Sequence, residues 1–111
     1  MDIARLRALR ELSTRQTMAA VAEALFLTPS AVSQQIAQLE EEAGVPLTER
    51  QGRGVRLTPA GEVLVTHAER ILMVLDEARA DLADIKREIA GVLRVAAFPT
   101  VAAALLPQAI Q

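Results

Sequence analysis

Two groups of side chains in the first 58 residues are suited to chemistry, and the first is a set of serines and glutamines. Ser30, Ser33, Gln34 and Gln38 lie in a stretch where apolar residues recur at spacings of four, three and four, as on one face of a helix. At about 100° per residue, Ser30 and Gln34 fall on the opposite face, with Ser33 and Gln38 on its shoulders. Glutamine can bridge N6 and N7 of adenine in the DNA major groove. The apolar residues of the stretch are Val32, Ile36, Leu39 and Ala43.

The second group is a short basic stretch that contains Arg50, Arg53 and Arg56. Val55 and Leu57 alternate with polar residues behind a glycine-rich turn at 51–54, which predicts a small β-hairpin over residues 45–58. Arg53 at the tip would suit a narrow minor groove, where the negative potential is enhanced, and Arg50 and Arg56 would each suit a phosphate.

Each of these residues also has a simpler interpretation. A polar helix face is usually only solvated, Arg53 would then be a turn charge, and Arg50 would pair with Glu49 or Glu42. Many helix-turn-helix folds bind proteins instead of DNA. Periodicity alone therefore leaves both interpretations open.

The sequence offers little for catalysis or metal binding. It has no cysteine and one histidine, His67, and Glu40, Glu41 and Glu42 run around a helix instead of along one side. The Gly52–Gly54 turn is too short for a phosphate-binding loop. We expect no enzymatic activity, no cofactor and no metal site.

Net charge excludes a generally basic surface. The chain carries a net charge of −2. Residues 1–58 hold seven arginines and seven acidic residues, whereas residues 59–90 hold four basic and seven acidic residues. Binding to nucleic acid would therefore depend on local groups of residues. No apolar stretch reaches the about 20 residues that cross a bilayer, and with no cysteine the expected location is the cytoplasm, without a membrane partner.

Capping residues divide the first part of the chain into three short helices. Apolar residues from Ile3 to Leu12 predict the first, and Thr17 can cap a second that ends near Phe26. Thr28 followed by proline starts the third, and Gly44 is placed to end it in the left-handed conformation. With the hairpin, this predicts a mainly α, winged helix-turn-helix fold.

A long helix follows, opened by Thr58-Pro59. Its apolar residues step by 4, 3, 4, 3, 4, 3 and 4, the seam of a coiled coil, over about 45 Å at 1.5 Å per residue. Such a stripe needs a partner helix, which predicts a homodimer. The seam residues are Leu64, Ala68, Ile71, Leu75, Ala78, Leu82, Ile85 and Ile89.

The last residues have a different pattern. We expect Gly91 to end the long helix, residues 92–96 to form a buried strand, and residues 102–110 to begin another helix. A lone strand cannot bury itself, so this tail predicts the opening of a second domain. The expected regions are 1–58, the winged helix-turn-helix domain; 59–90, the linker and dimerisation helix; and 91–111, the start of a truncated domain.

The residues themselves go further than their periodicity. Several segments match a family pattern: residues 28–40, Gly44-Val45-Pro46-Leu47, Arg50, Gly52-Arg53-Gly54-Val55 and Leu57-Thr58-Pro59-Ala60-Gly61. Together they resemble the DNA-binding domain of LysR-type transcriptional regulators. The resemblance covers about residues 3–90. It implies sequence-specific binding of double-stranded operator DNA as a dimer. The DNA-contacting residues expected are Thr28, Ser30, Ser33, Gln34, Gln38, Arg50 and Arg53.

The resemblance also implies regulation by a small-molecule effector. Residues 91–95 resemble the first strand of that family's effector-binding domain, and Thr100 falls where the family contacts effector, so this role belongs to the intact protein only. A higher oligomer is implied for the intact protein as well. Pro29, Ala20 and Thr48 depart from the family pattern, in which a glutamine, an arginine and a phenylalanine are frequent.

The strongest alternative is a coiled-coil interaction module whose helix-turn-helix docks a protein. The DNA-binding function and the protein-docking alternative differ in how strongly affinity depends on salt, because binding to DNA weakens steeply as counterions compete.

Overall fold

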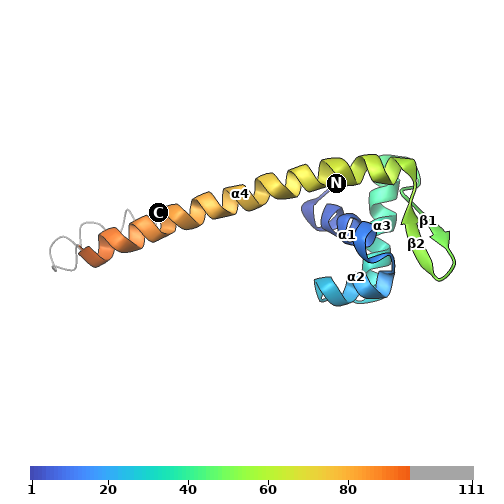
Figure 1. Cartoon of the computed structure of the whole chain (residues 1–111), viewed down its shortest axis with the longest axis horizontal. Coiled ribbons are helices and arrows are strands. Elements are labelled where there is room, and N and C mark those ends of the chain that lie inside the picture. Colours follow the sequence, from blue (N-terminus) through green and yellow to red (C-terminus); the bar gives the residue numbers. More distant parts are fainter. Residues whose placement is uncertain (96–111) are drawn as a thin grey trace. The chain divides into compact units, whose positions relative to one another are not determined.

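The computed structural model describes residues 1–95, which form four helices and one two-stranded antiparallel sheet (Figure 1). Residues 1–73 form one compact unit, and the described residues after them belong to a second. The fold class predicted from the sequence is confirmed. In chain order the elements are α1 (Ile3–Arg15), α2 (Met18–Leu25), α3 (Pro29–Ala43), β1 (Thr48–Gln51), β2 (Gly54–Leu57) and α4 (Pro59–Val95).

Local capping chemistry accounts for the ends of the short helices. The side chains of Asp2, Thr17 and Thr28 each accept a hydrogen bond from a backbone N–H in the first turn of α1, α2 and α3, respectively. At the other end of α3, Gly44 adopts a left-handed φ of 76°, and its N–H bonds to the Glu40 carbonyl. The predicted boundaries of these helices are therefore confirmed.

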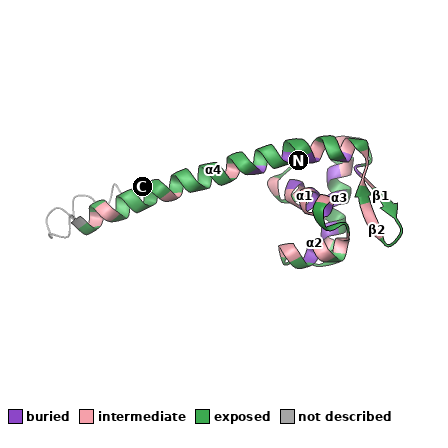
Figure 2. Ribbon diagram, in the orientation of Figure 1, coloured by how far each residue is buried: buried purple, intermediate pink, exposed green. Residues whose placement is uncertain are grey.

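The three short helices pack around one apolar core in the first unit (Figure 2). Leu9 and Leu12 of α1, Val21 of α2, and Ile36 and Leu39 of α3 are almost completely buried. Burial of each such side chain contributes about 1.5–3 kcal/mol before the entropy of ordering the chain is subtracted. This core holds α3 in a single rotational setting, with its polar face outward.

The hairpin forms as predicted, with Thr48 opposite Leu57 and Gln51 opposite Gly54. It is anchored to the helices through Gln16, whose carbonyl accepts the Val55 N–H at 2.8 Å. A β-carbon at position 54 would lie 2.9 Å from that same carbonyl oxygen. Glycine at 54 therefore lets the second strand approach the end of α1.

The end of α4 differs from the expectation. Gly91 does not end the helix, which continues to Val95, and the strand predicted to begin at residue 92 is not formed over residues 92–95. Val92 is 53% exposed instead of buried. A lone strand has no partner for its backbone groups, whereas a helix satisfies them locally. The helix predicted over residues 102–110 lies outside the described residues.

Candidate nucleic-acid interface

The exposed face of α3 carries the polar residues predicted from the sequence. Ser30, Ser33, Gln34 and Gln38 are all exposed, whereas Val32, Ile36 and Leu39 on the opposite face are buried. None of the four polar side chains makes a hydrogen bond to another residue of the described part of the chain. Their donors and acceptors are therefore available to a partner, on one side of a helix that the core holds in place.

Thr28, also predicted as a contact residue, has a structural role at the start of this helix. Its Oγ1 accepts the Ala31 N–H at 3.1 Å, which satisfies one of the free donors of the first turn. The hydroxyl keeps its own proton, and Thr28 is exposed. Capping therefore leaves this hydroxyl able to donate to a partner.

The wing, which is the hairpin of β1, β2 and the turn between them, carries two arginines that have no acidic partner in the described part of the chain. Within residues 1–95, no ion pair involves Arg50 or Arg53, and both are exposed. Gly52 next to Arg53 adopts a φ of 60°, which glycine reaches without strain. The alternative in which Arg50 pairs with Glu49 or Glu42 is not observed.

Arg56 differs from the other two wing arginines. Glu49 faces Arg56 across the two strands, and the carboxylate accepts a hydrogen bond from the arginine Nε. The expectation that Arg56 would hold a phosphate, as Arg50 would, is therefore not supported in the free chain. The partner of Arg56 is set by strand register, because residues directly opposite each other in a hairpin have neighbouring side chains.

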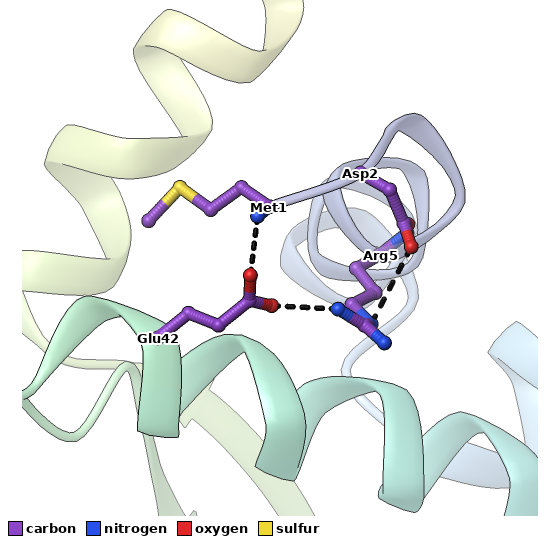
Figure 3. A network of polar contacts seen from close by, with 4 residues as sticks. All are labelled: Met1, Asp2, Arg5 and Glu42. Atoms are coloured by element: carbon purple, nitrogen blue, oxygen red, sulfur yellow. Dashed lines mark hydrogen bonds and ion pairs between the residues drawn. The ribbon is translucent and has the colours of Figure 1, made fainter.

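The negative charge at the far end of α3 is balanced by α1. Glu42 accepts a hydrogen bond from the Met1 amino group and another, of 2.7 Å, from Nη1 of Arg5 (Figure 3). The Nε of Arg5 lies 3.6 Å from Oδ2 of Asp2. The hydrogen bond from the Met1 amino group, assisted by Arg5, lowers the pKa of the Glu42 carboxyl below its usual value. The network joins the start of α1 to the last turn of α3.

Glu11 is balanced within α1. Its carboxylate accepts hydrogen bonds of 2.8 Å from Arg15 and 3.1 Å from Arg10. The hydrogen bond from Arg15 is the main cause of a lowered pKa at Glu11, partly opposed by burial. Two arginines near the end of α1 are thus engaged with a carboxylate, in contrast to Arg50 and Arg53 of the wing.

Two features at the base of the wing were not anticipated from the sequence. The Glu40 side chain accepts the backbone N–H groups of Leu47 and Thr48, at 2.8 and 3.3 Å, and so ties α3 to the start of β1. The Leu47 carbonyl accepts the Thr58 N–H at 3.0 Å and lies against Gly61 at the start of α4. These contacts join residues 7 to 14 positions apart, whose partners no local periodicity indicates.

The sequence pattern indicates only that Phe26, between α2 and α3, ends a helix. In the structure it caps α2 with a left-handed φ of 57°, and its side chain is 95% exposed. The available signal was an aromatic residue that falls outside the apolar stripe of its helix.

The predicted seam of α4 divides into two parts. Ala68 is completely buried in the core of its own chain, and Leu64 packs against that core. Ala68 is therefore not available to a partner helix as the uninterrupted seam implied, because it belongs, with Val65, to the apolar core of the first unit. Leu75 is half-buried and Ala78 exposed. The exposed large apolar residues of the seam are Ile71, Leu82, Ile85 and Ile89.

Several other expectations concern different kinds of site. Thr100, the expected effector contact, lies outside the described residues. Within residues 1–95, no cluster of three or more histidine, cysteine, aspartate or glutamate side chains is placed to hold a metal ion. In the same part of the chain, no helix combines the length and apolarity needed to span a bilayer.

A helix-turn-helix with an exposed polar second helix and a basic two-stranded wing defines a winged helix-turn-helix DNA-binding domain. Residues 3–62 match the family model of the bacterial regulatory helix-turn-helix proteins, lysR family. The chain belongs to the LysR family of DNA-binding transcriptional regulators.

Curated relatives agree with this membership. An uncharacterized HTH-type transcriptional regulator in the ibpB-leuC intergenic region of Azotobacter vinelandii is 41% identical over 86% of this chain and 67% of its own length. The HTH-type transcriptional regulator MetR of Haemophilus influenzae is 36% identical over 86% of this chain. The chain spans only 31% of MetR.

Solved structures agree as well. A CbnR DNA-binding domain in complex with DNA has a TM-score of 0.69 and 31% identity, covering 76% of this chain and 99% of that one. A BenM DNA-binding domain in complex with benA site 1 DNA has a TM-score of 0.71 and 30% identity, covering 77% and 96%.

Proposed function

We propose that this chain binds operator DNA as a homodimer, with α3 in the major groove and the wing against the neighbouring minor groove. The observation that carries the proposal is the exposed face of α3, where four polar, uncharged side chains have no partner within the described chain. An unpaired polar face on a helix held rigidly by its core is suited to reading base edges. Its likeness to domains solved with DNA supports the same assignment.

Within this proposal the residues have different tasks. Gln34 contacts adenine N6 and N7, with Ser30, Ser33 and Gln38 beside it on the exposed face. Thr28 donates its free hydroxyl proton to a phosphate oxygen at the start of the helix. The Pro29 side chain has no donor or acceptor for a base edge, which shifts base contacts to the residues after it.

The two free wing arginines complete the interface. Arg50, in β1, neutralises a phosphate whatever the sequence, because phosphate contacts position the protein without reading bases. Arg53, at the exposed tip beside Gly52, enters a narrow minor groove and favours A·T-rich flanks. Their freedom from acidic partners in the described chain supports both roles.

The dimer is proposed to form through the exposed seam of α4. Ile71, Leu82, Ile85 and Ile89 are 37–65% exposed in the single chain, at the spacing of a heptad seam. Ala78 is also exposed, and Leu75, which is half-buried, keeps part of its surface for the partner. Two linked domains bind paired half-sites at high effective concentration.

Effector control and higher assembly are proposed only for a form of the protein as long as its relatives. The chain spans 31% of MetR, so Thr100 and the residues around it would need the remainder of such a protein to form an effector site. The proposed location is the cytoplasm, where operator DNA is found in bacteria. A coiled-coil module that docks a protein remains the alternative function, distinguished by its weaker salt dependence.

The experiment that tests the function uses the full chain and DNA fragments from its own genome. Fragments retained by the protein are sequenced, and fluorescence anisotropy then compares the enriched sequence with a scrambled duplex at several salt concentrations. We expect at least about a thousandfold preference and a steep loss of affinity with salt. Equal, salt-insensitive binding to both duplexes would favour the protein-docking alternative.

A further inference from the structure

Phe26 combines two properties that nothing within residues 1–95 explains. It is 95% exposed, although it is the only aromatic residue among the described residues. Its φ of 57° lies in the left-handed region, which glycine and asparagine reach most easily. A large apolar side chain at such a position gains no burial from the fold.

The comparison with Gln16 shows what is unusual. Gln16 is the other residue in the described chain, apart from glycines, with a positive φ. There the backbone conformation has a visible use, because the Gln16 carbonyl accepts the Val55 N–H and anchors the wing. At Phe26 the backbone only ends α2, through hydrogen bonds from its own N–H and from the Leu27 N–H to the Ala22 carbonyl. That function requires no phenyl group.

The position of Phe26 indicates what its side chain meets. It lies two residues before Thr28, the N-cap of α3, in the turn that joins α2 to α3. Leu27, Thr28 and Pro29 between it and the polar face are also exposed. An unbroken run of exposed residues thus joins Phe26 to the first residue of the polar face, Ser30, which we assign to the major groove.

The chemistry of that groove offers one apolar group, the C5-methyl of thymine, which phenylalanine can contact. We propose that Phe26 packs against a thymine methyl at the edge of the operator half-site, next to the bases read by α3. Phe26 then adds a preference for thymine at one position beyond those contacted by Ser30 and Gln34. This inference rests on the proposed function, because it requires sequence-specific binding in the major groove.

The test replaces thymine by deoxyuridine, which lacks only the methyl group. In the duplex enriched by the full chain, each thymine is replaced in turn, and affinity is measured by fluorescence anisotropy. For the unmodified protein, one replacement in each half-site should weaken binding about fourfold, as expected for exposing one methyl-sized apolar group. Because the substitution removes the contact from both half-sites of the dimer, Phe26→Asn should bind the thymine duplex about sixteenfold more weakly and show no further loss at either deoxyuridine.

Two controls keep the outcome clear. Asparagine tolerates the left-handed conformation, so Phe26→Asn should melt at the same temperature or higher. Phe26→Met keeps an apolar side chain and should retain the sensitivity to deoxyuridine, which provides a second measurement if the asparagine variant does not fold.

Three results would overturn the inference, and they are distinguishable from failure of the function itself. If the chain prefers its enriched sequence but no thymine replacement matters, or if Phe26→Asn responds to deoxyuridine as the unmodified protein does, only the role of Phe26 is wrong. An equal loss on random DNA would assign the phenyl to the backbone. If no sequence is enriched, the proposed function and the inference both fail.

Discussion

Replacing Gly61 by alanine should destabilise the domain strongly, although alanine normally stabilises a helix. Gly61 lies in the first turn of α4, where a β-carbon would come within 2.1 Å of the Leu47 carbonyl oxygen and 3.2 Å of the Leu57 β-carbon. Real β-carbons essentially never approach other atoms closer than 3.0 Å, so the backbone would shift by about 0.9 Å. The atom that it meets is backbone, which cannot rotate away.

The size of the effect follows from what that carbonyl does. Leu47 O accepts the Thr58 N–H at 3.0 Å, so moving it also weakens a hydrogen bond at the base of the wing. Overpacking costs about 1–3 kcal/mol and the hydrogen bond about 1 kcal/mol, offset by about 1 kcal/mol from the higher helix propensity of alanine. We expect a net loss of about 2 kcal/mol, which lowers Tm by roughly 10 °C for a domain of this size.

The assay is thermal and urea unfolding of the full chain, at matched protein concentration because the proposed dimer would contribute to stability. Gly91→Ala is the matched control, since a β-carbon at that position of the same helix meets nothing within 4 Å. It should leave Tm unchanged or raise it, with up to about 1 kcal/mol gained locally. The packing argument would be refuted by a Gly61→Ala variant as stable as the unmodified protein.

Three further predictions concern the wing, the seam and Glu11. Arg53→Ala should reduce the preference for A·T-rich over G·C-rich flanks, whereas Arg50→Ala should weaken binding to all DNA and lower the slope of log affinity against log salt by about one unit. If Arg53→Ala instead loses the same factor of affinity on both kinds of flank, the wing makes only phosphate contacts. Replacing both Leu82 and Ile85 by glutamate should give a monomer in sedimentation velocity. The control is Val63→Glu, which should remain a dimer because Val63 is also exposed but lies outside the seam. A double variant that is still a dimer would place the interface elsewhere. Because the pKa of Glu11 is lowered in the folded state, its carboxylate stabilises the fold above its usual pKa of about 4.5, and this contribution is lost as pH falls through the lowered value. Urea unfolding should show Glu11→Gln less stable than the unmodified protein by less than about 1 kcal/mol at pH 7, with the gap closing below pH 4.5; a gap that persists in acid would assign it to something other than charge.

The parts of the fold that depend on local chemistry were predictable from the sequence. Thr28 followed by proline and Gly44 at the other end define α3 by capping within one turn, and the apolar spacing decides which face is buried. The exposed polar face follows directly. Candidate contact residues on a short capped helix can therefore be found without tertiary information.

What could not be predicted depends on contacts between distant parts of the chain. The seam of α4 follows a sound heptad rule, but Ala68 is used by the core of its own chain, and periodicity cannot distinguish that core from a partner helix. The pattern of residues 92–95 predicts a strand, yet whether they form one depends on a sheet to join. The pairing of Glu49 with Arg56 depends on strand register.

The central claim, that the exposed face of α3 reads bases, is tested most directly by Gln34→Ala. Its affinity is measured on the enriched operator duplex and on a random duplex of the same length and salt concentration. The account predicts a loss of about 1–3 kcal/mol on the operator, about five- to 150-fold, and a much smaller loss on random DNA. Equal losses on the two duplexes would contradict it, because Gln34 would then contact only the DNA backbone.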